Sequence, residues 1–482
     1  LRLLRDGAHG LEFVNELVRG QVYTATPKSL RKSLHGSIAN LLLADPADAD
    51  ELETAWHCVR SGRVEEARPR IISGAQACIE RGALHEAELG LSSALKLLDG
   101  DFRIRALLLL SEVLQGQARW QESLNALELM DFPEVPSGPS NYFREKRTVL
   151  TTAARVKLGS IPTSDLSGTA LDLCRALRGT TDPRTISLAA RACANMASIT
   201  RDQVLAVTLL EDFARFSIES WPMYESGLLL LSRALLHFCC CDYAHGLEAL
   251  NHASRVLQLD TSPSQLAGDI LVGYGVIHAA TGRYQAGIEH LLRAVALAKR
   301  MGNDWLLILT AGNLAICFGR TGDYRAQVEW GTLTVQRGHP ENPYLRVQGL
   351  YSVAHGHARL GHTTEAVDAL TALAAEPLEF APAYVDQARH LYCAEVFELL
   401  GRRGDAIRHG RRGVTGKHLH LHSTNFAGLY ARWLARTATI TRDQNAMTKI
   451  ATLASEIERY DRVDQDEILR ALSELHEIST RT

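Results

Sequence analysis

The strongest constraint on the fold is a sequence pattern that recurs about every 40 residues. Turn glycines lie at Gly282, Gly322, Gly361 and Gly401, so the steps between them are 40, 39 and 40 residues. Each turn separates two apolar helical stretches, and small residues recur seven positions before and about five positions after most of the turns. Small residues at those places let two antiparallel helices approach closely, and a glycine ends the first helix. The pattern predicts a stack of helical hairpins.

The same frame extends in both directions along the chain. One step back from Gly282 reaches Cys241, and a further step reaches Arg201, while one step forward from Gly401 reaches Arg442. The segments 116–124, 81–89 and 61–67 repeat the turn pattern with less regular spacing. Because Cys241 stands where its counterparts have glycine, we expect its turn not to be strictly left-handed.

Composition supports an all-α fold and excludes several classes. Of 482 residues, 46% are hydrophobic and only 14 are proline, and β-branched alternation is nearly absent. The 52 basic and 55 acidic residues nearly balance, so no basic surface for nucleic acid is indicated. No apolar run is long enough to span a membrane. Nine cysteines without disulfide spacing suit a reducing cytoplasm, where we expect the protein to reside.

The repeat resembles the tetratricopeptide repeat (TPR), in which a small residue, a Gly-Asx/Lys-Tyr turn and a later Ala recur, as in "TGDYRAQ" at 321–327. Its length of about 40 residues is similar to that of the variant in the maltose-activator (MalT-like) family of large regulators. The resemblance implies a right-handed α-solenoid of TPR-like hairpins over residues 46–482, serving as a sensor domain.

Residues 1–45 do not share this frame and are expected to form a partial winged-helix segment. We expect two helices broken near "TATP", with Phe13, Leu17 and Val18 on the first and Pro27 at the first position of the second. The segment resembles the end of the winged helix of STAND-type ATPases. The matching residues are Phe13, Leu17, Val18, Arg19, Val22, Tyr23, Pro27, Arg31, Leu34 and His35, with Asn15 where that family often has His.

In STAND-type proteins a nucleotide-binding domain precedes such a segment, so the resemblance implies a fragment of a longer protein whose upstream domain holds ATP or ADP. This chain contains no phosphate-binding loop: "GVTGKHLH" at 413–420 lacks the first glycine and the final Ser or Thr of that motif. Common hydrolase and metalloprotease motifs are also absent from the sequence. We therefore expect no catalysis and no cofactor in this chain.

Two clusters of potential metal ligands are explained by the helical repeat and its connections. In "FCCCDYAHG" (238–246) consecutive cysteines on a helix point about 100° apart, so they do not converge on one ion, and Asp242 and Tyr243 fit the repeat turn. His418, His420 and His422 alternate in a turn-rich connection between helices. We predict no metal site at either place.

The first helix of each hairpin is expected to line the concave face of the solenoid. Projecting its register places Arg191, Asn195 and Asp269 on this face, whereas other repeats contribute Leu231, Leu235 and Phe238. The candidate ligand- or partner-binding residues are Arg320, Tyr351, His355, Arg359, Glu395, Glu398, Arg432 and Arg436. Arginines there suit anionic or hydroxyl-rich groups, although ordinary solvation of a concave surface explains the same composition.

The resemblance to STAND-type and MalT-like proteins implies a sensor arm of a signal-responsive ATPase switch with a transcriptional output, as in LuxR-type regulators. Its expected partners are a small-molecule effector or a protein on the concave face, together with its own upstream nucleotide-binding domain, and neither nucleic acid nor a membrane. Two alternatives remain open: a pattern-recognition repeat domain of a STAND defence protein, or a plain protein-interaction scaffold.

Overall fold

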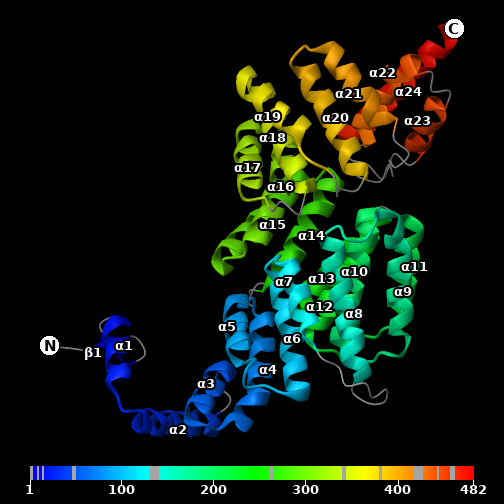
Figure 1. Cartoon of the computed structure of the whole chain (residues 1–482). Coiled ribbons are helices and arrows are strands. Elements are labelled where there is room, and N and C mark those ends of the chain that lie inside the picture. Colours follow the sequence, from blue (N-terminus) through cyan, green and yellow to red (C-terminus); the bar gives the residue numbers. More distant parts are fainter. Residues whose placement is uncertain are drawn as a thin grey trace. The chain divides into compact units, whose positions relative to one another are not determined.

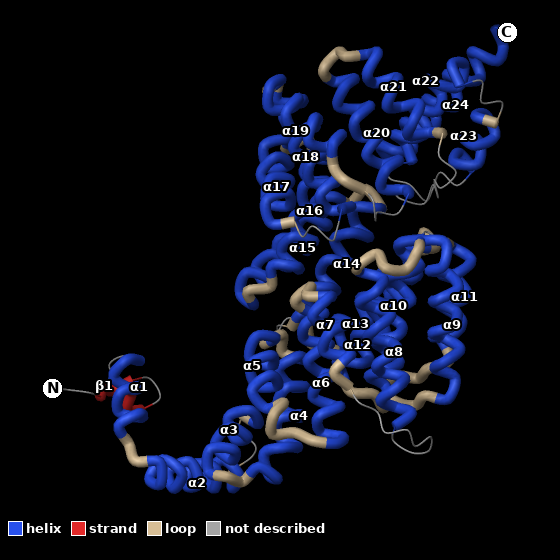
Figure 2. Tube along the Cα trace, in the orientation of Figure 1, coloured by secondary structure: helices blue, strands red, loops and turns tan. Residues whose placement is uncertain are grey.

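The computed structural model describes residues 4–7, 10–13, 16–45, 50–130, 140–200, 202–259, 264–338, 343–378, 383–415, 427–441, 445–455 and 462–481. These residues are almost entirely helical, which confirms the all-α expectation (Figures 1 and 2). They divide into two compact units. Unit 1 comprises residues 1–79, 83–114 and 126–132, and unit 2 comprises residues 80–82, 115–125 and 133–482. This division does not coincide with the predicted boundary at residue 45, which stays a prediction.

Unit 1 begins with an antiparallel strand pair that the sequence analysis did not predict, drawn in red in Figure 2. Strands β1 (Leu4–Gly7) and β2 (Gly10–Phe13) pair Leu4 with Phe13. The expectation that Phe13 lies on a helix is therefore wrong, since the helix begins only after the strand. A second correction concerns Pro27, which is the N-cap of the next helix rather than its first residue. The bounds of the first helices are α1 Glu16–Ala25, α2 Lys28–Ala44 and α3 Glu51–Ser61.

The remaining helices of unit 1 show the predicted hairpin turns. They are α4 Val64–Glu80, α5 Leu84–Ala94, α6 Gly100–Gly116 and α7 Trp120–Glu128, and α4, α6 and α7 each include residues assigned to unit 2. Asp50 caps α3 by accepting hydrogen bonds from the amides of Leu52 and Glu53. Gly62 ends α3 with a φ of 87°, a conformation that favours glycine. The core of the unit is built from small and aliphatic side chains such as Ala75 and Leu91.

Unit 2 is a succession of hairpins, each helix packing on its neighbours in the chain (Figure 1). Its helices are α8 Ser140–Lys157, α9 Leu166–Ala176, α10 Pro183–Thr200, α11 Gln203–Ala214, α12 Met223–Cys239, α13 Tyr243–Val256, α14 Gln265–Ala280, α15 Tyr284–Met301, α16 Asp304–Thr321, α17 Tyr324–Arg337, α18 Pro343–Leu360, α19 Thr363–Ala375, α20 Ala383–Leu399, α21 Arg403–Val414, α22 Ala427–Thr441, α23 Ala446–Ser455 and α24 Arg462–Arg481. Short 3₁₀ turns, Thr163–Asp165 and Leu177–Gly179, flank α9.

The predicted turn glycines occupy the left-handed conformation. Gly282, Gly322, Gly361 and Gly401 have φ between 73° and 83°. The predicted reason for small residues is also confirmed at one hairpin, where a Cβ on Gly275 would lie 2.5 Å from a side-chain atom of Leu291. The predicted turn positions Arg201 and Arg442 lie outside the described residues.

The expectation for Cys241 is wrong. Its φ is 57°, as in the glycine turns, and the same backbone hydrogen bond closes the turn, from the Asp242 amide to the His237 carbonyl at 2.9 Å. The equivalent bond joins Arg283 to His278 at 2.8 Å in the next hairpin. A left-handed residue with a side chain costs about 1–2 kcal/mol, and Cys241 offsets this strain by burial, with only 9% of the residue exposed.

Candidate functional site

The candidate residues of the sequence analysis lie on the first helices of four successive hairpins in unit 2. Arg320 ends α16, and Tyr351, His355 and Arg359 follow one another at four-residue steps on α18. Residues four apart lie on one face of a helix, so these three side chains point the same way. The other four candidates are Glu395 and Glu398 on α20 and Arg432 and Arg436 on α22.

Glu395 is the centre of this group. Its carboxylate accepts hydrogen bonds from the Tyr351 hydroxyl at 2.8 Å and from the Arg432 guanidinium at 3.3 Å. The side chains of Glu395 and Arg432 are 15% and 17% exposed. Burial opposes ionisation of Glu395, but Arg432, His355 and the Tyr351 hydroxyl prevail and lower its pKa to about 2. Glu395 is therefore a buried carboxylate that stays charged at neutral pH.

Contacts from neighbouring helices fix Tyr351 and His355. Tyr351 stacks on Tyr392, with ring centroids 3.8 Å apart and planes 10° apart. His355 Nδ1 lies 3.1 Å from Gln327 Oε1, and Arg359 Nε donates to His355 Nε2 at 3.4 Å. This pattern requires a neutral imidazole protonated on Nδ1. Consistently, burial lowers the pKa of His355 to about 4, with Glu395 opposing and Arg359 adding to the shift.

The last helix adds two carboxylates that the sequence analysis missed. Asp464 of α24 has a side chain only 2% exposed, and its Oδ1 lies 3.4 Å from Arg320 Nη2. Glu467 Oε1 lies 3.5 Å from Arg432 Nη1. Helix α24 reaches this place because α22 has Gly428, where a Cβ would lie 2.9 Å from the Asp464 Cα. Asp464 and Arg320 are 144 residues apart, so no local spacing indicates the contact. We call these seven residues the charged cluster: Arg320, Tyr351, His355, Glu395, Arg432, Asp464 and Glu467.

The three other candidates form a more exposed rim on the same helices. Arg436 pairs with Glu398, and their side chains are 36% and 35% exposed. Arg436 also lies over the Trp433 ring, 5.6 Å from its centroid. Exposed Arg359 lies 5.8 Å from the centroid of the Tyr324 ring. We call Arg359, Glu398 and Arg436 the rim.

The arrangement separates a mostly buried, ion-paired interior from more accessible cations. In the charged cluster two arginines face three carboxylates, and each of these charged side chains has at least one ion-pair partner within the cluster. The rim instead carries two arginines and one carboxylate. Aromatic contacts hold both rim arginines in place, and a positioned guanidinium suits a bidentate carboxylate or phosphate.

The remaining predicted face residues form a separate pair. Arg191 of α10 and Asp269 of α14 lie 3.1 Å apart although they are 78 residues apart in the sequence. Nearby Lys157 has its pKa lowered to about 8, chiefly because it is buried and also because Arg191 is close. His418, His420 and His422 lie outside the described residues.

Comparison with known proteins gives structural similarity only. No family model matches the chain, and no curated protein matches it either. Among solved structures, a Rap protein complexed with competence and sporulation factor is 12% identical, with a TM-score of 0.48 over 82% of this chain and 98% of that chain. Human IFIT1 with PPP-AAAA is 12% identical, with a TM-score of 0.46 over 92% of this chain and 94% of that one.

A third similar structure is a STAND protein with a tetratricopeptide-repeat sensor from Pyrococcus horikoshii. It is 13% identical, with a TM-score of 0.42 over 89% of this chain and 59% of that chain. Identities and scores this low carry no information about what this chain binds. Within the described residues, no helix combines the length and the apolar character needed to cross a membrane.

Proposed function

We propose that this chain is the sensing arm of a STAND-type switch, and that the rim is the surface at which it contacts an anionic effector or an acidic protein segment. The observation that carries the proposal is that Arg359 and Arg436 are exposed beside the mostly buried charged cluster. That cluster fixes α18, α20 and α22 relative to one another through Tyr351, Glu395 and Arg432. A contact surface ordered in advance loses less entropy on binding.

The switch itself follows from the resemblance of residues 11–42 to the end of a STAND winged helix. In such a protein, a ligand that binds one arrangement of the arm better than another shifts the population toward that arrangement. The nucleotide-binding domain that carries ATP or ADP would lie outside this chain. We propose a transcriptional output for the whole protein and no catalysis in the arm.

Two alternative functions use the same fold. A STAND defence protein would use its repeats to recognise a foreign protein, and a scaffold would hold a partner without any switch. The exposed rim suits all three functions, whereas the STAND-like motif from Phe13 to His35 favours the first two. The sequence beside this segment in the whole protein would distinguish them, through a helix-turn-helix, an effector domain or the lack of any phosphate-binding loop.

The experiment is a thermal-shift screen of the chain against small carboxylates, phosphates and acidic peptides. We expect a ligand that raises the melting temperature of the parent and raises it much less in Arg359→Ala and Arg436→Ala. Arg337→Ala is the matched control, because Arg337 is an exposed, ion-paired arginine on the second helix of a hairpin. A ligand that stabilises the parent and both rim variants equally would show that the rim is not the contact surface.

A further inference from the structure

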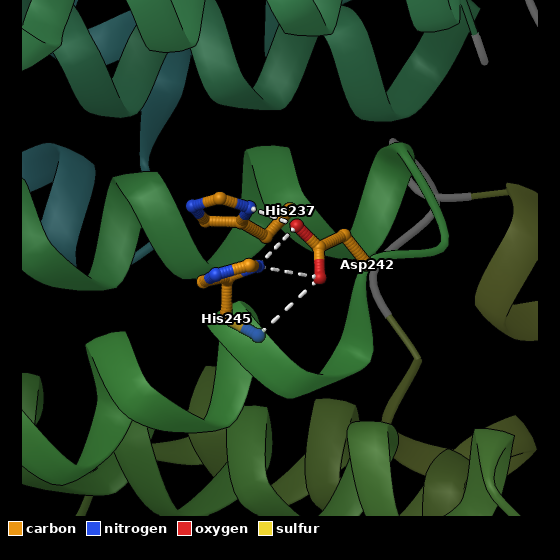
Figure 3. Close-up of side chains that lie close together, drawn as sticks. All are labelled: His237, Asp242 and His245. Carbon is orange, nitrogen blue, oxygen red and sulfur yellow. Dashed lines mark hydrogen bonds and ion pairs between the residues drawn. The ribbon is translucent and has the colours of Figure 1, made fainter.

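Three metal-ligating side chains converge at the turn between α12 and α13. His237 lies in the last turn of α12, Asp242 is the N-cap of α13, and His245 lies in the first turn of α13 (Figure 3). His237 Nδ1 is 3.1 Å from Asp242 Oδ2, and His245 Nδ1 is 2.9 and 2.8 Å from the two carboxylate oxygens. We call these residues the turn triad. Of the residues that the structure describes, only these three form such a group, with ligand atoms all within 4.8 Å of one another.

We propose that the turn triad binds a divalent transition-metal ion of the zinc type through His237 Nδ1, His245 Nδ1 and an Asp242 oxygen. Two imidazoles and one carboxylate are a ligand set that favours zinc and its neighbours over magnesium or calcium. Ligands about 2.0–2.1 Å from a tetrahedral ion lie about 3.3 Å apart. The observed separations between imidazole nitrogens and carboxylate oxygens, 2.8 to 3.1 Å, are close to that value, and all the ligand atoms lie within 4.8 Å of one another.

The exposure of the three side chains leaves room for a fourth ligand. His237 is 23% exposed, Asp242 37% and His245 64%, so the group opens to solvent on the side of His245. The two imidazoles face each other as a stack, with centroids 5.5 Å apart and planes 27° apart, and both present Nδ1 to the carboxylate (Figure 3). A water molecule or a group from a partner can complete the coordination, as at zinc sites with three protein ligands.

The fold does not require these residue types. The triad occupies the positions four before, one after and four after the turn residue Cys241. The same turn is closed by the same backbone hydrogen bond around Gly282, Gly322 and Gly401. There the three positions hold His278, Arg283 and Ala286, then Phe318, Asp323 and Ala326, then Phe397, Arg402 and Asp405. A turn of this kind forms equally well with aromatic, arginine and alanine side chains, so the turn alone does not explain the triad.

The three side chains also interact with one another electrostatically. Burial lowers the pKa of His237, with Asp242 opposing the shift and His245 and Arg233 adding to it. Burial would raise the pKa of Asp242, but its hydrogen bonds with His245 and the charges of both histidines lower it. Asp242 also caps α13 through the His245 amide at 3.4 Å, and a carboxylate has lone pairs enough for both tasks.

The three neighbouring cysteines are not part of the site. Cys239 and Cys241 are buried, and no cysteine belongs to the convergent group. The proposed ligands instead combine Asp242 and His245 of the stretch 238–246 with His237, which precedes it, so they lie on both sides of the turn. An ion bound here would join the end of α12 to the start of α13 and stabilise that hairpin.

The test is metal binding by the whole chain after treatment with a chelator. We expect one tight site per chain for Zn²⁺, a tetrahedral absorption spectrum with Co²⁺, and a rise in melting temperature on adding Zn²⁺ but not Mg²⁺. The variants His237→Phe, Asp242→Arg and His245→Ala each introduce a residue that a sister turn carries. Each should weaken Zn²⁺ binding about 100-fold or more, since loss of a group outside the coordination shell already costs about 10- to 100-fold.

Three control variants make the outcome decisive. Cys241→Gly and His252→Ala should leave the tight site unchanged, because the first tests the thiol and the second an exposed histidine on the same helix. His357→Phe removes the pair His357–His362, whose Nδ1 atoms are 3.3 Å apart at the turn around Gly361, and should also leave it unchanged. The proposal is overturned if the parent shows no single tight site, if the three triad variants bind as the parent does, or if a control variant abolishes binding.

Discussion

The charged cluster and the turn triad are both polar groups on hairpins of unit 2, but they differ in burial and in the kind of partner that each carboxylate has. In the charged cluster, Glu395 and Asp464 have guanidinium partners and little exposure. In the turn triad, one carboxylate faces two imidazoles, and His245 is 64% exposed. From this difference we expect the buried, ion-paired cluster to contribute to architecture and the more exposed turn triad to bind an ion.

The same contrast separates the charged cluster from its own rim. The cluster connects α16, α18, α20, α22 and α24, and it determines where the rim arginines stand. Stability should therefore depend on the cluster, and recognition should depend on the rim and the turn triad.

The largest expected effect is the loss of the central charge in Glu395→Gln. The variant keeps the side-chain volume but removes one of the two carboxylates that pair with the mostly buried Arg432, leaving the ion pair with Glu467. Breaking a buried pair by removing one partner typically costs about 3–5 kcal/mol, and we expect a loss near the lower value. Denaturant unfolding monitored by circular dichroism measures it.

The matched control is Glu398→Gln on the same helix. Glu398 pairs with Arg436 at the half-exposed rim, and exposed pairs contribute about 0–1 kcal/mol. If the two variants lose equal stability, the distinction between a structural cluster and an accessible rim is wrong.

The second effect is a pH dependence that arises from His355. Because burial lowers its folded pKa from 6.5 to about 4, the unfolded chain takes up a proton between those values and the folded chain does not. The stabilisation is fully present above pH 6.5 and is lost as the pH falls through about 4. Between pH 7 and pH 4.5 this amounts to about 2 kcal/mol at 1.36 kcal/mol per pKa unit.

The variant His355→Gln isolates this contribution, since Gln retains hydrogen-bonding capacity toward Gln327. We expect the parent to lose about 2 kcal/mol more than the variant over the same pH interval. His409, whose pKa burial and His390 lower to about 4, remains in both proteins and acts as an internal reference. Parallel pH profiles for parent and variant would show that His355 is not neutral and buried as described.

The repeat frame predicted the hairpins and the face of the charged cluster because both depend on short spacings. Tyr351, His355 and Arg359 share a face through four-residue steps, and Gly282 and Gly322 end helices through their backbone freedom. Asp464 and Glu467 were not predictable, because their contacts join helices far apart in the sequence. Strand β2 was not predicted because a strand of four residues is too short for alternation to identify. His237 was not predicted as a neighbour of His245 because the two residues lie on different helices on either side of the turn.

The smallest expected effect is that of His245→Ala on the metal-free chain. Its side chain is mostly exposed, and two sister turns already carry Ala at this position, Ala286 and Ala326. Exposed ion pairs and surface substitutions change stability by about 0.5 kcal/mol or less. Unfolding in the presence of a chelator should therefore give the same midpoint for parent and variant. A loss of more than about 1 kcal/mol would identify His245 as part of the helix cap, so that the triad, like the charged cluster, would serve the architecture. An unchanged midpoint without metal, together with a midpoint raised by Zn²⁺ in the parent alone, would separate the two polar groups by function.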